Sequence, residues 1–327
     1  MTTSVPPDLT PLPPSLRCWA QRQDGVFTTA QALRGGFSPD EVTAMVRRGD
    51  WARIRRGSYA LGAQWRVADP ATRHHLRVRA VTLSLRAPAV VSHHSAAVLH
   101  GLRLHEMPLG LVHVTHPLGA GSGRRESDVH HHEAVTPDAD RTQVHGMDVT
   151  TPVRTALDVA RVSPTPTALA LADGVLAAGA THAELLAMYE RQLDWPGSRG
   201  ASRVVALADG RSDSVGETLG RWALSAAGAP PDALQHEVST DLGVFRTDYA
   251  WVAQRVVGEF DGMVKYGRLL RPGESTQDVL VRERRRELAI ERAGWVVVRF
   301  TWTELQRPDL MLARVQRAFD RAQRLAP

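Results

Sequence analysis

The chain has 327 residues, of which 43% are hydrophobic and 23% charged, and its formal net charge is +5. This composition is that of a soluble globular protein with room for two or three domains, and the positive charge favours a nucleic-acid partner. The single cysteine, Cys18, excludes an internal disulfide and a multi-cysteine metal site. No apolar run reaches the roughly 20 residues that cross a bilayer, and no signal peptide is recognisable, so we expect a cytoplasmic protein without a membrane partner.

The N-terminal part of the chain has the pattern of a small helical domain with a basic hairpin. Residues 1–15 are rich in proline and are expected to be disordered. Residues 16–65 are predicted to form three short helices and two strands, and Ser38, followed by a proline and two acids, begins the third helix. That helix ends at Gly49, and residues 51–60 alternate like a β-hairpin. This is the layout of a winged helix.

Five arginines lie in the last turn of the third helix and in the hairpin. In a winged helix these elements meet DNA, because the helix enters the major groove and the wing follows the phosphates. We therefore predict that double-stranded DNA is the partner of this domain. The alternative is a winged helix that binds protein or is purely structural, with its arginines solvated. The predicted nucleic-acid-binding residues are Arg47, Arg48, Arg53, Arg55 and Arg56.

Two successive parts of the chain resemble one known family. Residues 20–62 resemble the N-terminal winged helix of the AbiEi family of type IV antitoxins, and residues 73–162 resemble the next module of that family. Residues 66–200 are accordingly expected to form an α+β module, and the resemblance implies a transcriptional regulator with a cognate toxin or a homodimer as partner. The pieces that carry the resemblance are Val26–Thr29, Gly36–Ser38, Val46–Gly49, Trp51, Arg55–Ala60, Val91–Gly101, Val112–Pro117 and Thr150–Asp158.

The chain has 14 histidines, which raises the question of a metal site. Half of them lie in adjacent groups, namely His74-His75, His93-His94 and the triplet His130–His132. Neighbours in a strand point to opposite faces, and the groups lack the i, i+4 spacing of a helical zinc site. We therefore assign none of them a metal role from the sequence.

Residues 201–327 are predicted to follow the order α-β-β-β-α-β. Asp248 lies in the second of the three strands and Glu259 in the third, placed roughly evenly about a turn, so the two can face each other on one side of the sheet. Two neighbouring carboxylates favour a divalent cation, and Mg²⁺ or Mn²⁺ takes oxygen ligands. Glu217, on the preceding helix, could add a third carboxylate. The alternative is that Asp248 and Glu259 pair with Arg246, Arg255 or Arg299 in a structural network.

The only lysine in the chain, Lys265, follows Glu259 by six residues. An ammonium is a compact charge that can orient water or neutralise a phosphorane, which a rigid guanidinium does less readily. We therefore predict Glu217, Asp248, Glu259 and Lys265 as catalytic residues, with Asp248 and Glu259 as the metal ligands.

Residues 212–306 resemble the PD-(D/E)XK nuclease superfamily, and within it the DUF559 and very-short-patch repair branch. The resemblance implies Asp248 and Glu259 as ligands and Glu217 as an auxiliary acid. Two departures are present: Asp261 stands where the superfamily has its lysine, and Lys265 stands where the DUF559 pattern has a histidine. The resemblance rests on Glu217, Arg246–Trp251, Glu259–Gly262, Glu283–Arg286, Gly294-Trp295 and Val298–Phe300.

The sequence thus predicts an α/β protein with a winged helix, an α+β middle module and a restriction-endonuclease-like α/β domain whose mixed sheet is flanked by helices. The expected function is metal-dependent DNA cleavage targeted by the winged helix, in phage defence or DNA repair. The alternative is a non-enzymatic antitoxin-type transcriptional regulator with a degenerate nuclease domain. RNA as the substrate is a third reading.

Overall fold

The structure, a computed structural model, describes residues 8–119, 127–262 and 276–325. The chain divides into two compact units, one made of residues 1–171 and 183–205 and the other of residues 172–182 and 206–327. The predicted α/β fold class, with a winged helix at the N-terminus, is confirmed. The winged helix and most of the middle module fall in one unit, whereas residues 172–182 belong to the other.

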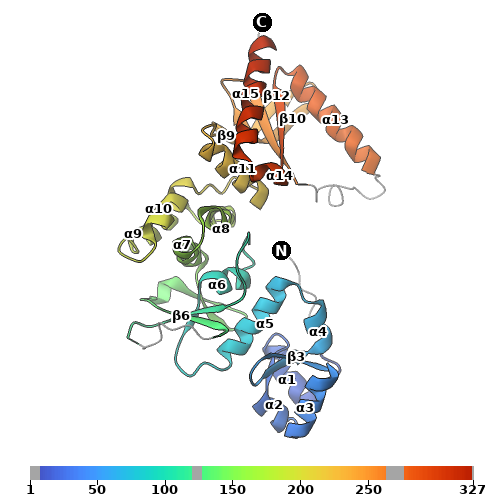
Figure 1. Cartoon of the computed structure of the whole chain (residues 1–327), viewed down its shortest axis with the longest axis vertical. Helices are drawn as coiled ribbons and strands as arrows, with labels where there is room; N and C mark the ends of the chain where they lie inside the picture. The colour runs from blue at the N-terminus through green and yellow to red at the C-terminus, as the bar shows by residue number, and fades with distance from the viewer. Residues whose placement is uncertain (1–7, 120–126, 263–275, 326–327) are drawn as a thin grey trace. The chain divides into compact units, whose positions relative to one another are not determined.

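The winged helix contains three helices and a small sheet (blue in Figure 1). Its core is aromatic: Phe27 meets Trp51 edge to face with ring centroids 4.7 Å apart, and Tyr59 packs beside them. The sheet is antiparallel in the order β1-β3-β2. In chain order the elements are α1 (Pro14–Arg22), β1 (Phe27–Thr28), α2 (Thr29–Arg34), α3 (Pro39–Arg48), β2 (Trp51–Arg55) and β3 (Ser58–Leu61).

The described part of the proline-rich N-terminus is packed, which corrects the expectation of disorder for residues 8–15. Leu9 and Leu12 are buried in the core of the winged helix. Arg17 holds this segment in place, because its guanidinium donates to the carbonyl oxygens of Thr10 and Leu12, each at 2.8 Å. The proline-rich composition was a poor guide to disorder in this segment, since burying two leucines is enough to hold a short stretch of chain against the core. Residues 1–7 of the predicted disordered segment lie outside the described residues.

The middle module is built on a five-stranded mixed sheet in the order β6-β5-β4-β8-β7. β5 and β6 run parallel, so His113 is level with His130 and Thr115 with His132. The elements before and within the sheet are α4 (Gly62–Val67), α5 (Pro70–Thr82), β4 (Val90–Val91), α6 (His93–Leu99), β5 (Val112–His116), β6 (Val129–Glu133), a 3₁₀ turn (Asp138–Asp140), β7 (Arg141–Val144) and β8 (Met147–Thr150).

A buried ion network joins α7 (Pro152–Val162) to the rest of the module. Thr151 caps α7 by accepting from the Arg154 backbone amide at 3.4 Å. Arg154 is 2% exposed and donates to Asp158 at 3.0 Å and to Asp140 at 3.2 Å. Arg154 and Asp158, both in the motif at 150–158, therefore have a structural role. Each neutralises the charge of the other in a place that water does not reach.

Three further helices follow α7, namely α8 (Thr165–Ala177), α9 (His182–Glu190) and α10 (Ser198–Leu207). The last turns of α8 belong to the second compact unit, where Asp173 accepts from Thr218 at 2.7 Å and from Arg221 at 2.8 Å. No pattern in the sequence indicates this division inside one helix. None of the helices in the described ranges combines the length and apolar character that crossing a bilayer requires.

The second unit contains a four-stranded mixed sheet in the order β12-β11-β10-β9, with β11 and β12 parallel (Figure 1). Phe260 and Tyr249 face α11 and α15, whereas Val257 and Ala250 face α13 through Ile290. The order α-β-β-β-α-β is present as predicted. Its elements are α11 (Val215–Ala226), β9 (Ala233–Thr240), β10 (Gly243–Trp251), β11 (Val256–Asp261), α13 (Thr276–Arg292) and β12 (Val296–Thr301), followed by α14 (Trp302–Leu305) and α15 (Pro308–Leu325).

Candidate functional site

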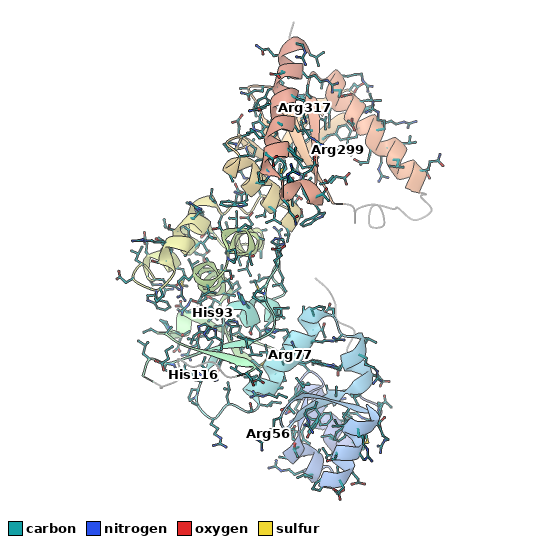
Figure 2. The ribbon with its side chains drawn as sticks, in the orientation of Figure 1. Arg56, Arg77, His93, His116, Arg299 and Arg317 are labelled. Atoms are coloured by element: carbon teal, nitrogen blue, oxygen red, sulfur yellow. The ribbon has the colours of Figure 1, made fainter. Side chains whose placement is uncertain are left out.

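The first candidate site is the cationic surface of the winged helix. Arg47 lies in the last turn of α3, Arg53 in β2 and Arg56 in the turn before β3, and all three are exposed (Figure 2 labels Arg56). No other side chain in the described part of the protein forms a hydrogen bond or ion pair with these three guanidinium groups. We call Arg47, Arg53 and Arg56 the wing arginines. They are three unneutralised cations, and they lie on the elements through which a winged helix contacts DNA phosphates.

The other two predicted DNA contacts are engaged within the protein. Arg48 Nε lies 2.8 Å from the carboxylate of Asp50, in an exposed pair. Arg55 lies 3.2 Å from the carboxylate of Asp128 and donates to Ser84 Oγ at 3.0 Å, so its guanidinium is directed towards the middle module. The sequence predicts all five arginines on one DNA-binding surface. The spacing of residues does not show that the hairpin packs against α5, and this packing is what turns Arg55 away from that surface.

The start of α3 is fixed by the capping box that the sequence predicts. Ser38 Oγ accepts from the Glu41 amide at 3.2 Å, and Glu41 accepts from the Ser38 amide at 2.7 Å. Hydrogen bonds from the Ser38 backbone amide and from its hydroxyl lower the pKa of the Glu41 carboxyl. The cap orients α3 and keeps the carboxylate of Glu41 beside the positive end of the helix, which stabilises both.

The second candidate site is the pair Asp248 and Glu259 in the second unit. The register of β10 and β11 pairs Tyr249 with Gly258, which puts Asp248 opposite Glu259 on the face that α13 covers. Asp248 accepts from the Phe260 amide at 2.7 Å. The structure therefore brings the two predicted ligands together on one face of the sheet.

Two arginines hold the carboxylate of Glu259. Arg286, from α13, lies 2.6 Å from one oxygen, and Arg299, from β12, lies 3.5 Å from the other (Figure 2 labels Arg299). Glu283 and Glu287 complete the network at 3.5 Å from Arg286 and 3.3 Å from Arg299. Because a guanidinium takes the place where a cation would sit, the described donors do not fit Mg²⁺ or Mn²⁺ in this arrangement. Lys265 lies outside the described residues.

Glu217 does not extend towards this pair. Its carboxylate accepts from the Asp213 amide at 2.7 Å, from Ser214 Oγ at 2.8 Å and from Gln235 Nε2 at 2.9 Å. The side chain is 4% exposed. With three donors, it caps α11 and ties this helix to β9, which is the role that a glutamate near a helix start takes without any catalytic function.

The sequence does not favour a function for Arg286, because a charged helix such as α13 is usually a solvated, ion-paired surface. The signal that could have found it is the position of Glu283–Arg286 within the nuclease-like pattern. Arg299, by contrast, was among the arginines expected in the alternative, structural reading of the carboxylates, and the structure places it in such a network.

Two stretches of the chain match family models. Residues 16–62 match the model described as a transcriptional regulator, AbiEi antitoxin, and residues 89–208 match the model of the AbiEi antitoxin C-terminal domain. Neither match extends beyond residue 208, so the nuclease resemblance of the later residues stays a prediction.

Two curated relatives match part of the chain. The chain is 28% identical over 183 residues to the uncharacterized protein MT2308 of Mycobacterium tuberculosis strain CDC 1551 / Oshkosh, and equally to the uncharacterized protein Rv2248 of strain H37Rv. The matched region is 55% of this chain and spans 65% of the length of each relative. Over residues 16–62 and 89–208, the chain is therefore similar to two AbiEi antitoxin family models, and each match spans less than half of the chain.

Proposed function

We propose that this protein is a DNA-binding transcriptional regulator of the AbiEi antitoxin type, and that its winged helix contacts duplex DNA through the wing arginines. The observation that carries the proposal is the set of three exposed guanidinium groups, on α3 and the wing, that no described acid neutralises. The AbiEi matches over residues 16–62 and 89–208 support it. A cognate toxin and a homodimer are the partners that the family resemblance suggests.

The test is the salt dependence of DNA binding by the full chain. Fluorescence anisotropy with duplexes from the gene's own upstream region and with unrelated duplexes would give affinities across a salt series. Each phosphate contact adds about 0.9 to the slope of log K against log salt. Replacing Arg47, Arg53 and Arg56 together by glutamine should lower the slope by about 2 to 3 on this basis.

A matched control is Arg203→Gln. Arg203 is an exposed arginine of α10, far along the chain from the winged helix, and its loss changes the net charge in the same direction. This variant should keep the wild-type slope. An equal fall in slope for Arg203→Gln, or a flat salt dependence of the wild type, would contradict the proposal.

A second candidate function is cleavage of DNA by the second unit. It is favoured by the α-β-β-β-α-β order and by the position of Asp248 opposite Glu259. Against it stands the ion pairing of Glu259 with Arg286 and Arg299. Plasmid cleavage with Mg²⁺ or Mn²⁺, comparing the wild type with Asp248→Ala, Glu259→Ala and Lys265→Met, tests it. Metal-dependent cutting that all three variants lose would establish the nuclease. If a preparation that binds DNA does not cut it, the transcriptional regulator is the only one of the two candidate functions that remains.

A further inference from the structure

A cluster of imidazoles lies in the middle module, where α6 meets the five-stranded sheet (Figure 2 labels His93). His93 is the first residue of α6, His113 lies in β5 and His132 lies in β6. One ring nitrogen from each lies within 4.8 Å of the other two. His113 Nδ1 and His132 Nε2 are 2.9 Å apart, and the rings of His93 and His132 stack at 3.8 Å.

Burial lowers the pKa of all three imidazoles and so disfavours their charged form. His93 and His113 are buried and His132 is half-buried. Burial, followed by the neighbouring histidines, lowers the pKa of His113 to about 2, and burial together with His130 and Arg161 lowers the pKa of His132 to about 3. A neutral imidazole keeps a lone pair on one ring nitrogen, which is the form that binds a metal ion.

The ring of His93 is held from outside the cluster. Its Nδ1 lies 2.9 Å from Ser92 Oγ, which in turn accepts from Thr115 Oγ1 at 2.7 Å. This contact leaves Nε2 of His93 for a ligand and is the second-layer hydrogen bonding typical of metal-binding histidines. The backbone of His93 has φ +50°, in the left-handed region that residues other than glycine adopt rarely and often at functional positions.

We propose that His93, His113 and His132 bind a divalent transition-metal ion, of which Zn²⁺ is the best match. Three nitrogen donors with one position left for water or another ligand is a known zinc arrangement, and imidazole suits Zn²⁺ better than Mg²⁺ or Ca²⁺. Zn–N bonds of about 2.0–2.1 Å in a tetrahedron place the nitrogens about 3.3 Å apart. The contact of 2.9 Å between His113 and His132 therefore opens by about 0.4 Å when the ion binds.

A cation beside the cluster does not oppose this assignment. Arg161, from α7, acts electrostatically on His93 and His132. Its guanidinium lies 2.8 Å from the buried carboxylate of Asp158 and also donates to Gln192, so its charge is compensated.

The opposite face of the same sheet provides an internal control. His116 Nε2 lies 2.9 Å from His131 Nδ1, and both residues are buried. The register places this pair with Val114, on the face away from His113 and His132. Among the described residues no third ligand joins this pair in a cluster. It has the same buried histidine contact without the third donor, so it should bind no metal.

The first experiment measures metal content by mass spectrometry in the full chain, purified without a histidine tag. We expect about one zinc per chain. His113→Gln and His132→Gln should lose it, whereas His116→Gln should retain it. His75→Gln should also retain it, which separates this cluster from the group formed by Asp24, His75 and His145.

A second measurement uses the wild type alone, so that the test does not depend on whether the variants fold. Wild-type protein is stripped with a chelator and titrated with Co²⁺, whose ligand-field spectrum reports nitrogen coordination, and its melting temperature is followed with and without Zn²⁺. A tetrahedral-type Co²⁺ spectrum and a rise in melting temperature are expected. Zinc retained in the His113 and His132 variants, loss of zinc from folded His116→Gln, or a stripped wild type that Zn²⁺ and Co²⁺ do not affect would each overturn the assignment.

Discussion

A guanidinium nitrogen of Arg286 lies 2.6 Å from the carboxylate of Glu259, and this pair joins α13 to the sheet of the second unit. Arg286 also donates to the backbone carbonyl of Arg246 at 2.7 Å. The side chains are 21% and 12% exposed, so the charges are largely removed from water. Breaking such a pair costs more than breaking a surface pair, because the remaining charge stays buried without its partner.

We predict that Glu259→Gln lowers the free energy of unfolding of the second unit by about 2–3 kcal/mol. Urea unfolding measures this change. A double-mutant cycle with Arg286→Gln should give a coupling energy of about 1–3 kcal/mol. The matched control is Arg284→Gln, which removes an exposed arginine from the same helix and should cost less than about 0.5 kcal/mol. A coupling energy near zero would show that Arg286 does not hold Glu259.

Arg55 and Arg56 are neighbours with different surroundings, so they should differ in DNA binding. Arg55 is held by Asp128 and Ser84, whereas Arg56 is exposed. Arg56→Gln should reduce the salt slope of DNA binding by about 0.9, and Arg55→Gln should change it much less. Asp128→Asn removes one of the groups that hold Arg55, and it should raise the affinity for DNA. The same anisotropy titrations measure all three. Equal effects of Arg55→Gln and Arg56→Gln would place Arg55 on the DNA instead.

The stability of the first unit should depend on pH through Asp24. Burial raises the pKa of its carboxyl, but hydrogen bonds from His75 and Arg79, together with their charges, outweigh burial and lower it to about 2. His145 lies 3.6 Å from the same carboxylate. A carboxyl whose pKa falls from 3.8 to about 2 on folding contributes stability above pH 3.8, and this contribution is lost as the pH falls towards 2.

Asp24→Asn removes that contribution. We expect a loss of about 1–3 kcal/mol at neutral pH, since Arg79 is left buried without its carboxylate. The difference between wild type and variant should shrink between pH 4 and pH 2. Chemical unfolding at a series of pH values measures this difference in free energy of unfolding. The control is Asp320→Asn, which changes an exposed acid of α15, and its difference from the wild type should not change with pH. A difference that does not change with pH would contradict the role of Asp24.

The sequence predicted those features that depend on local pattern. Ser38 caps α3 and the two glycines at 49 and 57 adopt positive φ, because capping and turn chemistry are set by a few neighbouring residues. The position of Asp248 opposite Glu259 also followed from local spacing, since two strands joined by a short turn pair about that turn.

What the sequence could not supply are contacts between elements far apart in the chain. Arg286 reaches Glu259 because α13 packs across the sheet, and no periodicity gives the crossing of a helix over strands. The grouping of the histidines could not be predicted for the same reason. His93, His113 and His132 belong to three elements, and β5 and β6 are parallel neighbours, so residues that look unrelated by spacing become adjacent.

The approach of α11 to its sheet has a consequence for which substitutions this protein tolerates. A Cβ at Gly216 would lie 2.1 Å from the ring of Phe260, and one at Gly220 would lie 2.3 Å from the hydroxyl of Tyr249. The two positions are one helical turn apart, and glycine inside a helix costs about 1 kcal/mol relative to alanine. Alanine, which stabilises most helices, should therefore be excluded from both positions. A library of random variants selected for folding should keep glycine at both.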